Sequence, residues 1–334
     1  MKPFRLGMLG MWHTHADGMA RQIVTHPAEF EWVGCYDPEP AVCEQRRKAW
    51  RDLFPDVREF STPEELLEQP LDGVVIEGRV TDNLRWARMA LESGRPVLLE
   101  KPAGCDLQEH RRVAALAQDR GLHLQMTYLF RYMPAIQEIL RWSRRGDFGH
   151  IYMMRGRMPK ELSIYHRWVE ELAPYHGGIF FEMAGHLVDL MVTLLGKPQK
   201  IHSILAHHHT APPASFNDNG VAIFGCEGAH AVIEVPALET APTSRRIEVY
   251  GTEGSCIIPH LGSGHLANRK VQVIQTVRAG QADWETLELE DHPLQINDLR
   301  EFVAVVRGTK PPEWTREHDL DVQETLLTAS GMLG

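Results

Sequence analysis

Lys101 is the first residue whose type and position suggest chemistry. It follows the apolar residues 97–99 and Glu100, and it precedes Pro102. The apolar run is typical of a buried parallel strand, which must end at Pro102 because proline cannot donate to a ladder. Lys101 should then project from the carboxyl end of that strand, where open α/β sheets bind ligands. A lysine there could stabilise a developing alkoxide, and the alternative is a solvated strand end.

A second group of polar side chains, Glu182, His186 and Asp189, recurs at i, i+4 and i+7 within residues 177–196. This spacing places the three on one face of an otherwise apolar helix. Polar groups on a buried helix need partners or a cavity, so we expect this face to line a cleft, where histidine suits proton transfer. The alternatives are a satisfied core histidine, an internal role for Asp189, and a zinc site, for which the usual two-histidine helical motif is absent.

The elements that must position Lys101 are strands that alternate with helices. This pattern is typical of βαβ units and of a doubly wound parallel sheet, so we predict an N-terminal Rossmann domain over residues 1–127. The expected strands lie near residues 5–10, 31–36, 57–60, 73–76, 95–100 and 122–127.

Asp37 ends the second of these strands, twenty-odd residues beyond Gly10. An acidic residue at this place in a Rossmann domain hydrogen-bonds a ribose diol. A carboxylate there repels a 2′-phosphate, which favours NAD over NADP. The alternative is a turn or helix-capping role ahead of Pro38. The residues expected at the cofactor end of the sheet are Gly10, Trp12, His13, His15, Asp37, Glu77, Glu100 and Lys101.

The turn after the first strand differs from the dinucleotide-binding fingerprint, which contains three spaced glycines. Only Gly10 is present, because Trp12 and His15 occupy the second and third places. The imidazoles of His13 and His15 could hydrogen-bond a phosphate at the helix N-terminus. Packing is the second interpretation and a His-x-His metal pair the third, so we expect no resident metal.

The second half of the chain, residues 128–334, has a different pattern. One helix near residues 134–144 leads into a strand, and the segment around residues 177–196 forms a second helix. Strand-like runs then follow one another without intervening helices, which predicts an α+β domain with a large, mainly antiparallel open sheet. The runs lie at residues 200–206, 220–226, 231–237, 246–250, 255–259 and 270–277, and two helices near 294–307 and 320–330 close the chain.

Substrate selection is assigned to polar residues early in this second domain. Residues 160–176 are rich in polar and aromatic side chains, and two arginines lie on the strand before them. Their polarity suits a multiply hydroxylated or acidic small molecule. The candidates are Arg155, Arg157, Lys160, Tyr165 and His166.

The composition narrows the class of protein. A formal net charge of −10 argues against nucleic acid or an anionic membrane as partner. The five cysteines are an odd number without paired metal-type spacing, which indicates a reducing compartment. The amino terminus does not have the pattern of a signal peptide, and no apolar run is long enough to cross a bilayer. We therefore expect a cytoplasmic protein.

These motifs together resemble the glucose–fructose oxidoreductase / inositol dehydrogenase / MocA-like family. The resemblance rests on Glu100-Lys101-Pro102, on the helix with Glu182, His186 and Asp189, and on residues 128–134 and 250–255. It implies a dinucleotide-binding domain joined to a domain whose open sheet often builds a homodimer or homotetramer. Members of the family mostly oxidise or reduce a sugar, cyclitol or related polyol with NAD(P).

The resemblance also implies roles for individual residues. The family's lysine corresponds to Lys101 and its histidine to His186, while its aspartate corresponds to Glu182, which is longer by one methylene. We expect His186 to act as acid/base, Lys101 to stabilise the alkoxide, and Glu182 to orient His186. The alternatives are a regulatory protein that binds NAD or a sugar without turnover, and an enzyme that cleaves glycosides with the assistance of NAD.

Overall fold

The computed structural model describes residues 2–54, 57–161, 169–209, 213–240, 242–261, 264–266 and 269–333. The chain divides into two compact units. The first comprises Met1–Tyr128 with Pro293–Leu320, and the second comprises Leu129–His292 with Asp321–Gly334. The penultimate helix α10 (Leu294–Val306) thus returns to the first unit, and the last helix α11 (Arg316–Ala329) is divided between the two.

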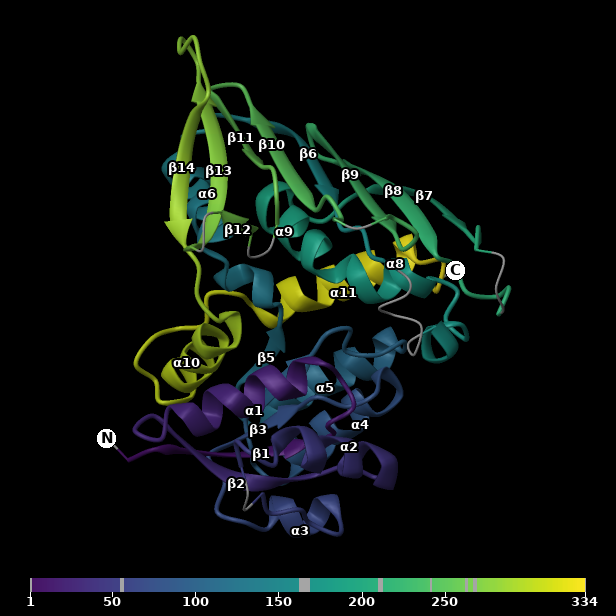
Figure 1. The fold of residues 1–334 in the computed structure, drawn as a ribbon, viewed down its shortest axis with the longest axis vertical. Coiled ribbons are helices and arrows are strands. Elements are labelled where there is room, and N and C mark those ends of the chain that lie inside the picture. The colour runs from purple at the N-terminus through teal and green to yellow at the C-terminus, as the bar shows by residue number, and fades with distance from the viewer. Residues whose placement is uncertain are drawn as a thin grey trace. The chain divides into compact units, whose positions relative to one another are not determined.

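The first unit is built on a five-stranded parallel sheet (Figure 1). Its inner strands are short runs of apolar residues that are buried on both faces, as a parallel sheet covered by helices requires. The strand order is β2-β1-β3-β4-β5. The strands are β1 (Phe4–Leu9), β2 (Phe30–Tyr36), β3 (Gly73–Ile76), β4 (Val97–Glu100) and β5 (Leu124–Thr127).

Helices connect these strands and cover the sheet. Figure 1 shows α1 and α10 lying side by side, and Phe302 of α10 packs edge-on against Phe4 of β1. Asp106 begins α5 by accepting a hydrogen bond from the Glu109 N–H, as an N-cap does. The helices of this unit, besides α10, are α1 (His15–Thr25), α2 (Pro40–Trp50), α3 (Pro63–Leu67), α4 (Val80–Glu92) and α5 (Leu107–Asp119).

The short strand expected near residues 57–60 is reduced to a single bridge between Cys35 and Glu59. The Cys35 N–H donates to the Arg58 carbonyl and the Phe60 N–H donates to the Cys35 carbonyl, each at 2.9 Å. Two hydrogen bonds at one residue are too few to make a strand. The edge of the sheet is therefore β2, and the order around β1 reverses between β2 and β3, which makes the carboxyl ends of β1 and β3 the topological switch point.

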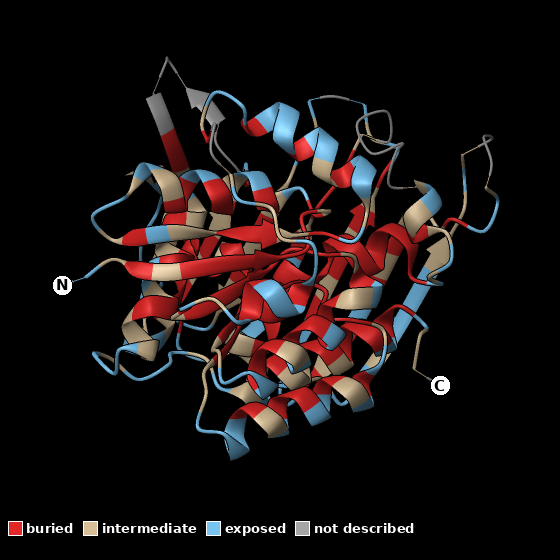
Figure 2. Ribbon diagram, turned by 90° about the horizontal axis from the view of Figure 1, so that it is seen from below, coloured by how far each residue is buried: buried red, intermediate tan, exposed pale blue. Residues whose placement is uncertain are grey.

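The second unit contains a nine-stranded sheet that is antiparallel except for the pair β6–β9. Buried and less buried residues alternate along β8 and β9, as expected for a sheet with one covered face. Figure 2 shows how buried residues are concentrated in the strands while several helices expose one face. The strands are β6 (Ile151–Arg157), β7 (Lys200–Ala206), β8 (Asn219–Cys226), β9 (Ala229–Pro236), β10 (Arg246–Gly251), β11 (Gly254–Ile258), β12 (Gly264–Leu266), β13 (Arg269–Arg278) and β14 (Glu285–Glu290).

The single helix expected over residues 177–196 consists of two helices. α8 (Gly178–Met183) and α9 (Gly185–Leu195) are separated at Ala184. The Leu187 N–H donates to the Ala184 carbonyl, so the turn is locally tightened to a 3₁₀-type bond. The described residues of this unit also form the 3₁₀ helix η1 (Leu129–Tyr132) and α6 (Pro134–Arg145). Within the described ranges, no helix is long and apolar enough to span a membrane.

Candidate functional site

Lys101 lies directly after β4, as expected, and is buried, with 3% of its surface exposed. The preceding Glu100 is completely buried at the end of the same strand. The peptide bond between Lys101 and Pro102 is cis. A buried lysine at the carboxyl end of a central parallel strand is placed where α/β proteins bind their ligands.

Asp37 lies immediately after β2 and holds the turn that follows β1. Its Oδ2 accepts a hydrogen bond from the Met11 N–H at 2.7 Å, and its Oδ1 accepts one from the Glu39 N–H at 2.9 Å. Burial raises the pKa of Asp37, although both N–H groups favour its ionised form. The two oxygens have about four lone-pair sites, so two bonds leave capacity for a hydroxylated ligand.

Gly10, the first glycine of the turn, has a backbone conformation that favours glycine. Gly10 has φ +77°, and a Cβ there would lie 2.3 Å from Cζ3 of Trp86 and 2.5 Å from Cα of Gly78. Trp12, which stands where a second glycine is usual, packs against the guanidinium of Arg79 at 4.9 Å. The turn therefore keeps the close approach at Gly10 and replaces the next glycine by an aromatic side chain.

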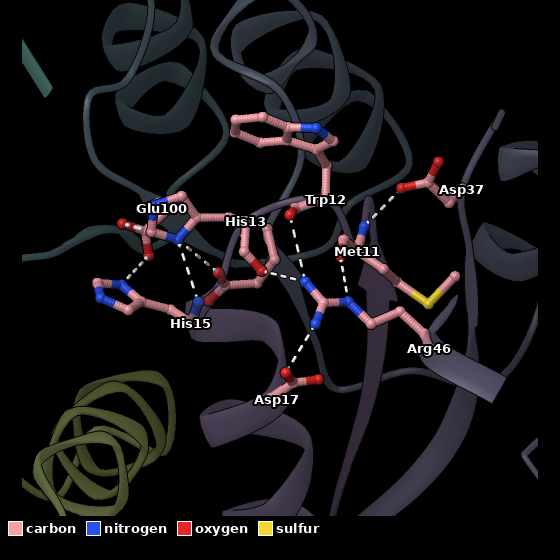
Figure 3. Close-up of polar contacts among 9 residues, drawn as sticks. Met11, Trp12, His13, His15, Asp17, Asp37, Arg46 and Glu100 are labelled. Carbon is pink, nitrogen blue, oxygen red and sulfur yellow. Dashed lines mark hydrogen bonds and ion pairs between the residues drawn. The ribbon is translucent and has the colours of Figure 1, made fainter. Parts of the chain in front are cut away.

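Arg46 of α2 fixes the carbonyl groups of this turn (Figure 3). Its Nε donates to the Met11 carbonyl at 2.6 Å, and its Nη2 donates to the carbonyls of Trp12 and His13 at 3.2 and 2.6 Å. Asp17 neutralises the guanidinium at 2.7 Å. Nothing in the local sequence distinguishes Arg46 from Arg47, the other arginine of α2, except that Arg46 lies on the buried side of the helix.

His13 and His15 lie beside two buried glutamates. Nδ1 of His13 is 3.6 Å from Oε2 of Glu77 and 3.6 Å from Oε1 of Glu100, and Nδ1 of His15 is 3.0 Å from Oε2 of Glu100. Burial, together with the nearby Glu100, raises the pKa of Glu77 well above its usual value. Burial also favours a higher pKa for Glu100, but the nearby His13 and His15 have the larger combined effect and lower the pKa of Glu100.

The three polar residues of the second unit are buried as predicted. Glu182 is 3% exposed and His186 is 4% exposed. Asp189 forms a buried ion pair with Arg131 of η1, with Nη2 2.6 Å from Oδ1 and Nε 3.0 Å from Oδ2. This pair gives Asp189 the internal role that was one of its alternatives. Phe130, next to Arg131, stacks on the His186 ring, and neither residue was assigned to the site although residues 128–134 were part of the family resemblance.

The expected substrate residues lie in different surroundings. Arg155 and Arg157 alternate along β6 with buried Met154 and Gly156, so they project from the face opposite to the one that packs on α9. Arg157 pairs with Glu239 at 2.6 Å. Lys160 is buried beyond the end of β6. Tyr165 and His166 lie outside the described residues.

Two family models match the chain. Residues 4–128 match the NAD-binding Rossmann fold of the GFO_IDH_MocA oxidoreductase family, and residues 136–257 match the GFO/IDH/MocA C-terminal domain. The chain belongs to the GFO/IDH/MocA oxidoreductase family. This membership confirms the resemblance seen in the sequence and the expectation that the chain is an oxidoreductase of the NAD(P)-dependent dehydrogenase type.

Curated members of the GFO/IDH/MocA family align with much of the chain. The scyllo-inositol 2-dehydrogenase (NAD(+)) of Bacillus subtilis (strain 168) is 26% identical over 315 residues, which cover 92% of this chain and 86% of the relative. The rhizopine catabolism protein MocA of Rhizobium meliloti is 26% identical over 204 residues, or 59% of each chain.

Solved structures share the fold of this family member. The myo-inositol 2-dehydrogenase from Lactobacillus plantarum superposes with a TM-score of 0.81 at 19% identity, covering 99% of this chain and 97% of the other. UDP-N-acetylglucosamine 3-dehydrogenase GnnA from Acidithiobacillus ferrooxidans gives a TM-score of 0.79 at 18% identity, with coverages of 99% and 98%. These likenesses confirm the predicted fold class, a Rossmann sheet followed by a large, mainly antiparallel sheet.

Proposed function

We propose that the chain interconverts a secondary alcohol and a ketone on a sugar, cyclitol or related polyol, with NAD as the preferred cofactor. The observation that carries this proposal is the burial of Lys101 at the carboxyl end of β4 in a family of NAD-binding oxidoreductases. A cation withdrawn from water acts strongly on a nearby oxygen that gains negative charge. The two inositol dehydrogenases among the similar proteins support a polyhydroxylated substrate.

The described residues fit a nicotinamide dinucleotide at two positions. Gly10, with φ +77°, allows the tight turn at the carboxyl end of β1, and Asp37 has lone pairs left for a ribose diol. A dinucleotide held by these residues would supply a nicotinamide that accepts or returns a hydride. The carboxylate of Asp37 would repel the 2′-phosphate of NADP, which supports NAD.

In this proposal His186 takes up and returns the hydroxyl proton, Lys101 stabilises the alkoxide, and Glu182 orients His186. Imidazole suits this proton transfer because its ordinary pKa lies near neutrality. Lys101 belongs to the first unit, and His186 and Glu182 belong to the second. Substrate hydroxyls would be selected by Lys160 and, outside the described residues, by Tyr165 and His166, with Arg155 and Arg157 as further candidates.

The first experiment is a fluorescence titration of the purified protein with NADH and NADPH in parallel. We expect tight binding of NADH and weaker binding of NADPH. In Asp37→Ser this preference should shrink or reverse. A preference of the wild type for NADPH would overturn the role of Asp37, and binding of neither would overturn the dehydrogenase.

A panel of polyols and cyclitols then identifies the substrate. On that substrate we expect Lys101→Met and His186→Gln each to reduce kcat by at least about 100-fold, because each removes a group that acts in the transition state. Lys48→Met, which removes an exposed lysine of α2, is the matched control. Near-normal turnover in both site variants would refute the assignment.

Assembly and location are part of the same proposal. Ile204 on β7 and Ile223 on β8 are large apolar residues that are 72% and 52% exposed, which supports a homodimer or homotetramer formed through the nine-stranded sheet. Light scattering after gel filtration tests this assembly, and a monomeric mass would refute it. All five cysteines are free thiols, which supports a reducing compartment such as the cytoplasm.

A further inference from the structure

Four side chains with metal-binding atoms meet at the topological switch point of the parallel sheet. They are His13, His15, Glu77 and Glu100, and one ligand atom from each lies within 4.8 Å of those of the other three. His13 lies in the turn between β1 and α1, and His15 begins α1. Glu77 follows β3, and Glu100 ends β4. These three strands are neighbours in the sheet, so the backbone itself holds the four residues together.

We propose that His13, His15, Glu77 and Glu100 bind one divalent transition-metal ion of the zinc class. Imidazole nitrogen and carboxylate oxygen are both common ligands of Zn²⁺ and of Co²⁺, which often substitutes for it. Two carboxylates balance the charge of a divalent ion, while the two histidines bind it as neutral imidazoles. The result is a neutral group, which suits a buried position.

The separations between these atoms are close to those that a bound ion needs. Tetrahedral bonds of about 2.0–2.1 Å place neighbouring ligand atoms about 3.4 Å apart. Nδ1 of His13 lies 3.6 Å from an oxygen of Glu77 and 3.6 Å from one of Glu100, and Nδ1 of His15 lies 3.0 Å from the other oxygen of Glu100. One ligand atom of each of the four side chains lies within 4.8 Å of the others, so a bound ion would draw them closer together.

Glu77 supplies an independent reason to expect a cation. Its side chain is completely buried, and among the described residues neither of its oxygens accepts a hydrogen bond. Oε1 of Glu100 accepts none from those residues either. Burial makes the ionised form of these carboxyl groups costly, and a metal ion bound to them would compensate that cost directly.

The surrounding backbone holds the histidines in place. The His13 N–H donates to the Glu77 carbonyl at 2.8 Å, and Arg46 binds the His13 carbonyl at 2.6 Å. The His15 N–H donates to Nδ1 of His13 at 3.3 Å, so this nitrogen is unprotonated, and an ion bound at Nδ1 would take the place of that hydrogen bond. Figure 3 shows both imidazoles beside Glu100. Such support from outside the ligand set is typical of metal sites.

The position of the site also indicates a role for the ion in cofactor binding, and this role rests on the proposed function. In Rossmann proteins the pyrophosphate sits at the first strand–helix turn. Here the buried carboxyl groups of Glu77 and Glu100 lie beside that turn, where negative charge would repel an anionic cofactor. A divalent ion between them would remove this repulsion, in a turn that has lost two of its usual glycines.

The test is a metal titration without dinucleotide or alcohol, so its outcome is independent of the proposed function. Protein that carries no polyhistidine tag is stripped with a chelator and titrated with Co²⁺. We expect visible d–d absorption that saturates at one ion per chain and is displaced by Zn²⁺. Elemental analysis after dialysis against Zn²⁺ should give the same stoichiometry. Absence of both signals would overturn the proposal.

Matched variants locate the ion. We expect His15→Ala and Glu77→Gln to weaken binding by at least about tenfold, the loss that even supporting residues around a metal commonly cause. His202→Ala removes an exposed histidine of β7 and should bind Co²⁺ as the wild type does. Unchanged affinity in both ligand variants would also overturn the proposal. In that case, imidazole signals in NMR spectra at neutral pH would show whether protonated histidines balance the two glutamates instead.

Discussion

The imidazole of His186 lies flat against the ring of Phe130, with the ring centroids 4.2 Å apart and the planes 13° from parallel. The next residue of η1, Arg131, binds Asp189, which lies about one helical turn beyond His186 in α9. Two adjacent residues of η1 therefore hold two residues on one side of α9. This contact orients His186 from a segment more than fifty residues earlier in the chain.

Loss of the stacked ring should reduce turnover more than stability. A ring pair is worth about 0.5–1.5 kcal/mol, so we expect Phe130→Leu to reduce kcat by about 2- to 10-fold. Phe130→Tyr keeps the ring and should retain kcat. Steady-state kinetics on the identified substrate, together with thermal unfolding of each variant, measures both effects. Equal kcat for the leucine and tyrosine variants would contradict the orienting role.

The ion pair between Arg131 and Asp189 should be sensitive to loss of either partner. Both side chains are almost completely buried, so Arg131→Met leaves an uncompensated carboxylate and should destabilise the protein by about 3–5 kcal/mol. Arg47→Met breaks the exposed pair with Glu59 and should cost less than about 1 kcal/mol. Urea unfolding monitored by circular dichroism compares the two. Similar losses would show that burial does not govern the first pair.

His110 of α5 should make stability fall in mild acid. Burial lowers the pKa of His110 to about 4, and among the described residues its Nδ1 has no hydrogen-bond partner. Between about pH 4 and the ordinary pKa of 6.5, the unfolded chain binds a proton at His110 that the folded chain does not bind. The contribution of His110 to the free energy of unfolding is therefore fully present above about pH 6.5 and is lost as the pH falls.

The expected loss from His110 is about 2 kcal/mol between about pH 7.5 and pH 5. His110→Leu removes the titrating group, and its stability should depend less on pH by that amount. Urea midpoints of both proteins at the two pH values provide the comparison. Parallel pH dependence of the two proteins would argue against a buried neutral histidine.

Gly10→Ala should distort the turn, whereas Gly94→Ala should have only a small effect on stability. Both glycines have positive φ, +77° and +79°, so each substitution incurs similar backbone strain of about 1–2 kcal/mol. Only at position 10 would the new Cβ also collide with Trp86 and Gly78, because nothing lies within 4 Å at position 94. We expect a clearly larger loss of unfolding free energy and of NADH binding for Gly10→Ala. Equal losses would show that φ alone matters.

Local patterns predicted most of the fold. The apolar runs of β3 and β4 and the breaks at Gly78 and Pro102 are local features, and they were sufficient to predict parallel strands and the place of Lys101. The run at residues 200–206 corresponds residue for residue to β7. The polar alternation of β14 was missed, because an exposed strand at the edge of a sheet has few apolar residues to reveal it.

Pairings between distant residues were decided by the tertiary structure. The sequence pattern places Glu77 and Glu100 at the carboxyl ends of strands. Only the strand order brings them beside His13 and His15, for which the sequence alone indicates phosphate binding or packing. Arg46 of α2 likewise reaches the carbonyl groups of the turn only in the folded chain. The physical reason is that hydrophobic periodicity reports which face of an element is buried, whereas contacts between side chains depend on strand order, register and helix packing.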